Sequence, residues 1–578
     1  MNKIIYFLLL IGITLFASVT MLNWFDPIKE MSVLSITATG IFFLTVYAVL
    51  FYETITYREK FVKHIYTKGN MIFMILLTLV VLFSTFSIGH FKSMSLIVQL
   101  VTLIGACVAV FSTVLSITAV MMRKSFVLQQ QYVSKWMILI YSILPIIGWS
   151  IYLLANFPGE MSPDSFAHWR QIHTFEFNNW HPVVYTWLMI ILTKIWYSPA
   201  VVGLAQIIIL SLIFGYGLYQ FQKAGIHRIL IYICNLFIAC FPVYGAFSIV
   251  LWKDILYSAI LLLLTILMFA VYSSRGQWLR KNMHLLLLGF TGLALMLMRS
   301  NGIPIYFALT IVMIVMFLPY WKQLLITLVA VIASYMIITG PLFTAFQVDN
   351  KDPNEALGIP TQQFARVVVE NGDLSEEEEQ YIYQMMPEDK WHQYYDPYIT
   401  DPIKFSGDYN SDVVFDDVGY YAKTWASVSL KNPVIVTEAF LKQTSLVWQM
   451  NEPSDGYTNL NPGGIYHANT FNIEQEPVSN WLHDKMERML NITEIHFKTL
   501  IWRPATYMFF LLLMGYIAAR KTSWRAWLVT VPVILNIGTV TAGIPAQDFR
   551  YLLANSFAIA FLFLCALLTD RKQKERRA

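Results

Sequence analysis

Charged side chains are scarce in this chain of 578 residues. Charged residues make up 13% of the chain and hydrophobic residues 57%, whereas soluble domains carry about 25% charged residues. This composition excludes a soluble globular protein and predicts a multi-pass membrane protein in contact with membrane lipids. The net charge of +4 is too small to indicate a nucleic-acid partner.

Cysteine and nucleotide-binding motifs are also lacking. The four cysteines, Cys107, Cys234, Cys240 and Cys565, lie in apolar runs, where packing is a better explanation than a disulfide or a metal cluster. The chain has no Walker-type phosphate loop, no dinucleotide fingerprint and no nucleophile elbow. These absences argue against a soluble nucleotide-sugar site, and we expect no cofactor.

Long apolar runs are abundant. A transmembrane helix needs about 20 apolar residues to cross about 30 Å of hydrocarbon. We interpret residues 4–22 as a retained first helix rather than a signal peptide. Fourteen transmembrane helices are expected near 4–22, 32–52, 71–89, 95–121, 137–156, 200–220, 229–247, 254–273, 283–298, 303–319, 323–343, 504–519, 526–543 and 550–569.

Lysine and arginine in short loops predict the orientation of these helices. With fourteen crossings and a cytoplasmic N-terminus, every basic segment and the C-terminus fall in the cytoplasm. This scheme holds if the apolar segment 182–197 does not cross, and we expect it to be a juxtamembrane or re-entrant helix on the outer side. The basic segments are 58–63, 123–124, 223–228, 275–281, 520–521 and 571–577.

The positions of the long apolar runs divide the chain into four parts. Residues 1–136 form a four-helix transmembrane extension, and 137–343 form a transmembrane core whose first outer loop is 157–199. Residues 344–503 form an extracytoplasmic insert, and 504–578 form the last transmembrane helices with a basic cytoplasmic tail. The predicted fold is an all-α polytopic bundle with an inserted, mainly helical domain.

The insert is polar but not of low complexity. It contains 25 acidic and 11 basic residues, a net charge of −14. Ser375 followed three residues later by Glu378 predicts a capped helix start. Pro433 and the apolar spacing up to Trp448 predict a second helix. Its aromatic and amide side chains suit sugar binding, although simple packing of the insert is the better explanation for any single one of them.

A short polar stretch directly follows the helix at 137–156. It gathers titratable side chains that are otherwise rare, namely Glu160, Asp164, His168, Arg170, His173 and His181. Ionisable residues at a membrane are costly and by default mark function. Asp164 is a candidate general base, and His168 and His181 could assist it or relay a proton. The histidines could alternatively bind a metal, but their spacing does not match a helical pair, and we expect no metal site.

Three cations are predicted on the same outer face. Lys253, Arg299 and Arg550 could bind a phosphate or diphosphate. The alternative is that they anchor helix ends to lipid headgroups. Asp254 and Asp548 neighbour two of these cations, and orienting them is a simpler role than catalysis.

The order and sidedness of these short motifs resemble the GT-C class of membrane glycosyltransferases, and more closely the bacterial DUF6020 family of GT-C-like proteins. The motifs are Ser162-Pro-Asp-Ser165 with His168-Trp169, His181-Pro182, Trp252-Lys-Asp254, Arg299-Ser-Asn-Gly302 and Asp548-Phe-Arg-Tyr551. The chain departs from the GT-C pattern in having one Asp in the loop unless Glu160 is the second, four extra helices before the core, and an inserted rather than C-terminal domain.

The resemblance implies transfer of a sugar from a polyprenyl-phosphate donor to a cell-envelope glycan or lipid acceptor outside the cytoplasm, with inversion at the sugar carbon. It assigns the catalytic carboxylate to Asp164 and a lipid-phosphate contact to Arg550. The expected catalytic residues are Asp164, His168 and His181. The expected substrate-binding residues are Glu160, Lys253, Asp254, Arg299, Asn301, Asp548, Arg550 and Tyr551.

Two other functions are compatible with the composition. A lipid or polysaccharide transporter or flippase would carry paired repeats with broken helices at the membrane midplane, but no repeat is visible and the polar residues gather at one face. A non-catalytic scaffold whose insert binds a partner is the third reading.

Overall fold

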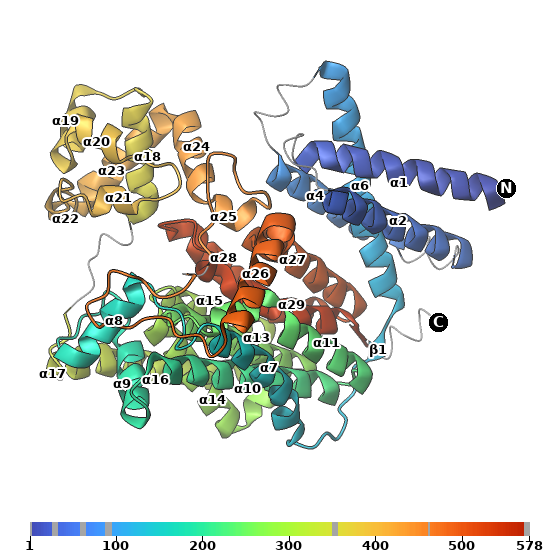
Figure 1. Cartoon of the computed structure of the whole chain (residues 1–578), viewed down its shortest axis with the longest axis horizontal. Coiled ribbons are helices and arrows are strands. Elements are labelled where there is room, and N and C mark those ends of the chain that lie inside the picture. Colours follow the sequence, from blue (N-terminus) through green and yellow to red (C-terminus); the bar gives the residue numbers. More distant parts are fainter. Residues whose placement is uncertain are drawn as a thin grey trace.

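A computed structural model gives the structure for residues 3–25, 33–57, 65–86, 95–349, 357–460 and 463–570. Within these ranges the fold is helical, apart from isolated bridges and one two-stranded parallel sheet that pairs β1 (Phe126–Val127) with β2 (Leu568–Thr569). Figure 1 shows the arrangement: a large bundle, an inserted helical domain (yellow and orange) and an N-terminal group of helices (blue). The predicted basic segments at 58–63 and 571–577 lie outside the described residues.

The transmembrane bundle is built from apolar helices on both sides of the insert. Before the insert these are α7 (Met137–Ala155), α8 (Pro163–Thr174), α9 (Val183–Ile195), α10 (Pro199–Lys223), α11 (Arg228–Cys240), α12 (Pro242–Ser248), α13 (Lys253–Ser273), η1 (Gln277–Arg280), α14 (Asn282–Met298), α15 (Gly302–Met316), η2 (Leu318–Tyr320), α16 (Trp321–Ile337), the π-helical turn η3 (Ile338–Leu342) and α17 (Phe343–Ala345). The insert ends with α26 (Asn480–Ile501), which is amphipathic rather than apolar. After the insert the bundle helices are α27 (Pro504–Lys521), η5 (Trp524–Val529), α28 (Val531–Gly543), η6 (Phe549–Leu552) and α29 (Leu553–Ala566).

Each of the fourteen predicted transmembrane helices coincides with an apolar helix, but not all of them are long. Among the described residues, 8 helices are long and apolar enough to cross a membrane, or up to 10 if each bent helix pair is one span. The other predicted spans coincide with shorter apolar helices, including α14, α15 and α28. The protein is therefore a multi-pass membrane protein, while the total of fourteen crossings and the sidedness of the loops stay predictions.

Helix α13 lies at the centre of the bundle. It is apolar on all its faces, as expected for a helix surrounded by protein, and nearly all of its residues from Asp254 to Tyr272 are buried. It packs against α10, α14 and α29. We call the end of the bundle at which α7 ends and α13 begins the site end, because the polar motifs gather there.

The insert forms a helical domain with its own apolar core, which includes Phe364, Ile382 and Trp391. The predicted capping box is present, since the Ser375 N–H donates to Glu378 Oε2 at 2.8 Å. Gln547 of the bundle holds the insert in place by donating to the carbonyl of Gln443 at 2.7 Å. The helices are α18 (Gly358–Val369), α19 (Glu376–Met385), α20 (Glu388–Tyr394), α21 (Asp401–Lys404), α22 (Asp412–Asp416), α23 (Val418–Lys431), α24 (Pro433–Gln443) and α25 (Ser445–Trp448).

The N-terminal extension consists of α1 (Lys3–Phe25), α2 (Val33–Thr56), α4 (Lys68–Thr85) and α6 (Leu96–Arg123). These helices pack mainly on one another and lie to one side of the bundle (Figure 1). Phe73 of α4 stacks on Tyr516 of α27 with ring centroids 3.7 Å apart. Lys521 of α27 is fully buried and donates to the carbonyls of Met121, Lys124 and Ala566 at 2.8, 2.6 and 2.7 Å.

We predict that Lys521→Met lowers the stability of the protein by on the order of 3 kcal/mol, because it leaves buried carbonyls without their charged donor. The thermal midpoint of the detergent-solubilised protein measures this. Lys124→Met removes the same charge from an exposed side chain and should change the midpoint little. Equal midpoints for the two variants would show that Lys521 does not hold the extension to the bundle.

Candidate functional site

The polar stretch after α7 folds back onto the segment that precedes α13. The Glu160 N–H donates to the carbonyl of Ile249 at 3.1 Å, and the Leu251 N–H donates to the carbonyl of Glu160 at 3.0 Å. This backbone pairing joins two motifs that are about 90 residues apart in the chain. Glu160 itself is buried and is not among the residues that line the cavity described below; its expected role in substrate binding stays a prediction.

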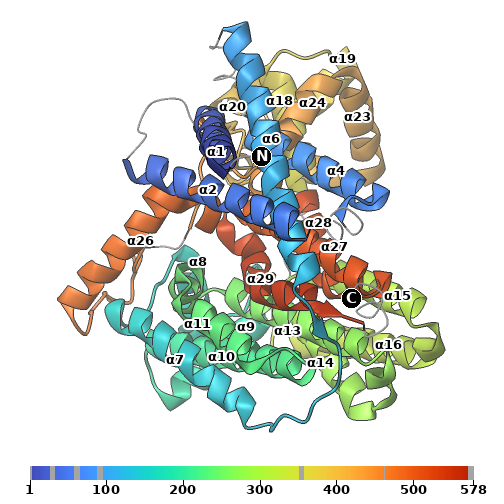
Figure 2. The same ribbon diagram turned by 90° about the vertical axis from the view of Figure 1, so that its right-hand side faces the viewer.

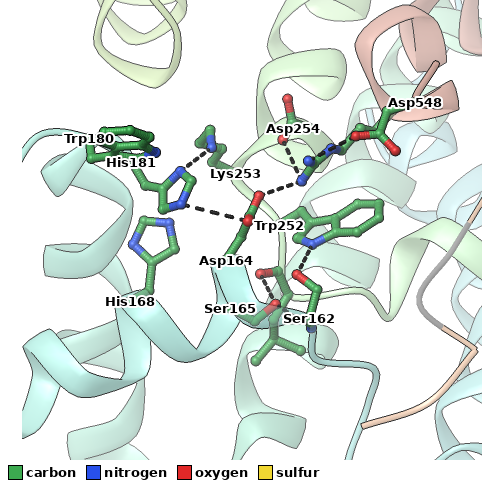
Figure 3. Close-up of polar contacts among 12 residues, drawn as sticks. Ser162, Asp164, Ser165, His168, Trp180, His181, Trp252, Lys253, Asp254 and Asp548 are labelled. Carbon is green, nitrogen blue, oxygen red and sulfur yellow. Dashed lines mark hydrogen bonds and ion pairs between the residues drawn. The ribbon is translucent and has the colours of Figure 1, made fainter. Parts of the chain in front are cut away.

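Helix α8 begins at Pro163, a residue that favours the first turn of a helix. The Ser162 N–H donates to Ser165 Oγ at 3.1 Å, and Ser165 Oγ donates to the carbonyl of Leu251 at 3.0 Å. Trp252 Nε1 in turn donates to Ser162 Oγ at 2.7 Å. These bonds fix the first turn of α8, so that Asp164 faces the start of α13 (Figure 3).

Arg550 is the centre of the charged cluster. Its guanidinium contacts Asp164 Oδ2 at 2.6 Å, Asp548 Oδ2 at 3.0 Å and Asp254 Oδ2 at 3.9 Å. It also lies over the ring of Trp252, 4.4 Å from the centroid. Within the described residues, the buried Nε of Arg550 has no hydrogen-bond partner. One buried donor of this arginine is therefore unused within the protein.

His181 bridges Asp164 and Lys253, as Figure 3 shows. The Lys253 ammonium donates to His181 Nδ1 at 2.7 Å, and His181 Nε2 is 3.7 Å from Asp164 Oδ1. Burial and the nearby Lys253 lower the pKa of His181 to about 3. The imidazole is therefore neutral, with Nδ1 as acceptor and the Nε2 proton directed at Asp164.

The Asp164 carboxyl is ionised in this setting. Burial by itself would raise its pKa, but the facing Arg550, Lys253 and His181 outweigh burial and hold the pKa below its ordinary value. The side chain is 28% exposed, so a ligand can reach it.

His168 lies behind His181 rather than in the cavity. It is buried, its ring centroid is 5.4 Å from that of His181, and its Nδ1 is 2.7 Å from Thr186 Oγ1. Burial lowers its pKa well below the ordinary value. His168 does not line the cavity, and from this position it can support His181.

The second arginine of the cluster comes from the end of α14. Arg299 pairs with Asp254 Oδ1 at 2.5 Å and lies 4.9 Å from the ring centroid of Tyr551. Arg299, Asp254, Tyr551 and Asn301 all line the cavity. The cluster thus holds three cations and three carboxylates, and Lys253 is the cation without a carboxylate within 4.0 Å among the described residues.

These charged groups form one end of a cavity of about 1140 Å³. The rest of the cavity is mainly apolar and is lined largely by α14, α15, α16, η3 and α28, with Asn179, Ser300, Thr339, Asp401 and Thr539 as polar members of the lining. The described apolar lining consists of Met296, Leu297, Pro304, Ala308, Phe343, Ile534, Leu535, Gly538, Ala542 and Pro545. A charged end that continues into an apolar groove between membrane helices suits an amphiphilic ligand.

Four residues of the site were not among the candidates from the sequence. Trp252 supports Arg550, and Trp180, Asp401 and Phe405 line the mouth of the cavity. Trp180 directly precedes His181 in the polar stretch, and this position in the sequence could have identified it as a site residue. Asp401 and Phe405 carried no signal, because the folding of the insert brings α21 to the cavity. The Phe405 and Trp180 ring centroids are 5.3 Å apart.

A metal site does not emerge from this geometry. In the described part of the chain, no group of three or more His, Cys, Asp or Glu side chains is placed to hold a metal ion.

Comparison with protein families gives a match over most of the chain. The model of a family of unknown function, DUF6020, matches residues 169–578. The chain belongs to this family. The DUF6020 match contains His181, Lys253, Arg299 and Arg550, whereas Asp164 and the N-terminal extension precede it. Comparison with curated proteins and with solved structures gives no match.

We predict that Arg550→Met destabilises the protein by on the order of 3 kcal/mol at neutral pH, because removing one partner strands buried carboxylates. The wild-type pKa of Asp164 lies below its unfolded value, so the ion pairs add stability above about pH 4 that is lost at lower pH. The difference in thermal midpoint between the two proteins should therefore be largest at pH 7 and narrow toward pH 3.

The matched control is Arg170→Met, which removes an exposed arginine from α8. It should leave the midpoint nearly unchanged at every pH. A midpoint difference for Arg550→Met that stays constant between pH 7 and pH 3 would contradict the ion-pair assignment.

Proposed function

We propose that this protein is a GT-C-type glycosyltransferase that moves a sugar from a polyprenyl-phosphate donor to a cell-envelope acceptor. The observation that carries the proposal is the single cavity in which Asp164, Lys253, Arg299 and Arg550 continue into an apolar groove. A phosphate with a long hydrocarbon tail matches both ends of this cavity. The GT-C assignment implies about fourteen crossings with the site at the outer face of the membrane.

The donor phosphate would bind between Lys253 and Arg550. Lys253 has His181 rather than a carboxylate as its nearest partner, and Arg550 has an unused buried Nε donor. Charge-assisted hydrogen bonds from such groups to phosphate are strong. The low polarity around them strengthens the attraction further.

The polyprenyl tail would lie in the apolar groove. One wall is α28, and the opposite wall is formed by Tyr335, Thr339 and Phe343 on the helix that η3 interrupts. A π-helical turn of this kind changes the register of a helix and often occurs at functional sites. An isoprenoid chain buried there would gain about 25 cal/mol for each Å² of apolar surface removed from water.

The reaction would be a direct displacement. Asp164 accepts the proton of the acceptor hydroxyl, whose oxygen forms a bond to the anomeric carbon while the bond from that carbon to the phosphate oxygen breaks. The electron pair leaves with the polyprenyl phosphate, and the sugar carbon inverts. Negative charge grows on the phosphate during this step, so Lys253 and Arg550 stabilise the transition state more than the ground state.

Arg550 would change partners when the donor binds. In the ligand-free protein it contacts Asp164 at 2.6 Å, and an ion-paired carboxylate is a weak base. A donor phosphate that draws the guanidinium away would raise the pKa of Asp164 and make it a better base. The neutral His181 keeps its Nε2 proton near Asp164 and holds the carboxylate in position.

The acceptor would enter between the insert and the loop before α9. Trp180 and Phe405 stand at this mouth with Asp401. Aromatic rings beside polar side chains suit a saccharide. On this proposal the insert selects the acceptor, and the membrane bundle binds the donor.

We predict that Asp164→Asn abolishes function without unfolding the protein. Loss of a general base costs about 10²–10⁴-fold in rate. Cells that lack the gene should lose one component of their envelope glycans. The wild-type gene should restore that component and the Asp164→Asn gene should not, at equal protein levels in the membrane.

Glu176→Gln makes the same chemical change at an exposed residue just beyond α8 and should restore the component fully. Full restoration by Asp164→Asn would remove Asp164 from the role of base. An unchanged glycan composition after deletion of the gene would count against glycosyl transfer to the envelope.

We also predict that Gly538→Phe closes the groove. A Cβ added at Gly538 meets no atom within 4 Å, and the glycine lines the cavity, so a phenylalanine ring at this position would occupy part of the groove. Native mass spectrometry of the purified protein should show co-purified polyprenyl phosphate falling by about tenfold, the loss of about 1.4 kcal/mol of binding free energy.

Gly12→Phe provides the control for added bulk. A Cβ added at Gly12 also meets no atom within 4 Å, and Gly12 lies on α1, away from the cavity. This variant should retain the lipid. Retention of the lipid by Gly538→Phe would place the tail elsewhere.

A further inference from the structure

Helix α26 differs from the long helices of the bundle. It spans 22 residues, yet within it Met486 alone is buried. Figure 2 shows α26 at the edge of the molecule, and in Figure 1 it lies in front of the bundle. The described part of the chain therefore leaves a large face of this helix uncovered.

The side chains of α26 sort into three stripes at helical spacing. The stripe that faces the bundle contains Leu482, Met486 and Leu490, which pack in its main core. A second stripe is polar and mainly acidic, with Asp484, Glu487, Asn491, Glu494 and Lys498. The third, which we call the mixed face, consists of Trp481, Lys485, Arg488, Ile492 and Ile495.

The mixed face combines large apolar side chains with cations. Trp481, Ile492 and Ile495 are 68%, 45% and 72% exposed. Lys485 and Arg488 are also exposed, and neither forms an ion pair with any described residue. Exposing these three apolar side chains to water is unfavourable. An entirely apolar partner surface would also be unfavourable, because it would remove the two charges from water.

The ends of α26 place it at the level where membrane helices end. At its start, His483 Nδ1 lies 3.0 Å from Asn156 Oδ1, next to the last residue of α7. At its end, Lys498 pairs with Glu452 at 2.8 Å, and the neighbouring Asn451 donates to the carbonyl of Thr85, the last residue of α4. Both α7 and α4 are long enough to cross a membrane.

An aromatic group stands at the same level. Trp196 and Tyr197, which are 45% and 67% exposed, follow α9. The Trp196 ring centroid is 6.2 Å from that of Phe157, and the carbonyl of Phe157 accepts a bond from the Glu476 N–H shortly before α26. Exposed Trp and Tyr residues typically mark the boundary between hydrocarbon and headgroups.

We propose that α26 is an interfacial helix whose mixed face binds a membrane surface with anionic headgroups. Trp481, Ile492 and Ile495 enter the boundary of the acyl chains, while Lys485 and Arg488 extend their charged ends to headgroup phosphates. The acidic stripe then faces water, where repulsion from anionic lipid is least. The helix bends by 43° into α27, so it anchors the site end at a set depth.

The test uses the full-length protein in lipid nanodiscs made of phosphatidylcholine and phosphatidylglycerol. Cys107, Cys234, Cys240 and Cys565 are first replaced by Ser, and a single cysteine is introduced as Ile492→Cys and labelled with an environment-sensitive fluorophore. Asn491→Cys on the acidic stripe is the matched control, one residue away. Correct folding of each protein is checked by its thermal midpoint.

The label at 492 should emit at shorter wavelength, resist iodide and be quenched by a lipid that carries a spin label near its headgroup. The label at 491 should be open to iodide. Equal quenching of the two labels by iodide overturns the proposal. Protection at 492 without quenching by the spin-labelled lipid also overturns it and indicates a protein surface, such as a second copy of this chain.

A second measurement tests the cations. Phosphatidylglycerol added to the protein in neutral detergent should raise the thermal midpoint of the wild type. The double variant Lys485→Gln and Arg488→Gln should lose most of this increase, whereas Lys423→Gln, at an exposed lysine of the insert, should keep it. An undiminished increase in the double variant shows that the mixed face does not bind anionic headgroups.

Discussion

The pairing of charge inside an apolar bundle is the constraint on which this structure depends. An unpaired charge removed from water costs several kcal/mol, and Arg550 meets this cost through three carboxylates. Asp164 comes from the first turn of α8, Asp254 from the first turn of α13 and Asp548 from the segment before the last helix. The same contacts that neutralise the arginine therefore bring three distant parts of the chain to one end of the bundle. Moving any one of these parts would leave the others with an uncompensated charge.

The balance of charge also connects the fold to the proposed chemistry. The ligand-free cluster holds as many cations as carboxylates, and its one cation without a carboxylate neighbour, Lys253, rests on a neutral histidine. An anionic ligand can therefore bind by exchange: it takes Arg550 from Asp164, and the neutral His181 stays beside the carboxylate. The apolar groove that continues from the cluster gives such a ligand a place for a hydrocarbon tail. The insert contributes Asp401 and Phe405 to the mouth of the same cavity, whereas none of the described residues of the N-terminal extension lines it.

Local patterns in the sequence predicted local structure well. Ser375 and Glu378 form the expected capping box, and Pro433 begins the expected helix, since caps and first turns depend on a few adjacent residues. The motifs of the polar stretch and of α13 were expected on one face and do lie together. Their pairing was not predictable, because the sequence offered three cations as partners for Asp164. Glu160 was expected to bind the substrate, and the structure buries it. Trp252 and Phe405 were missed, because their roles depend on contacts between segments that are far apart in the chain.

By itself, the sequence determined that the protein spans a membrane several times, where its apolar helices lie and which few ionisable residues are candidates for function. These properties follow from the composition and from the spacing of apolar residues along the chain, because both determine which segments can be buried in hydrocarbon. The tertiary structure decided which of the candidates meet, that Arg550 rather than Lys253 or Arg299 contacts Asp164, and that His168 lies behind His181. It also decided that the charged cluster opens into an apolar groove. The physical reason is that ion pairs and cavities arise from distances between helices, and these distances are set by how all the helices pack together.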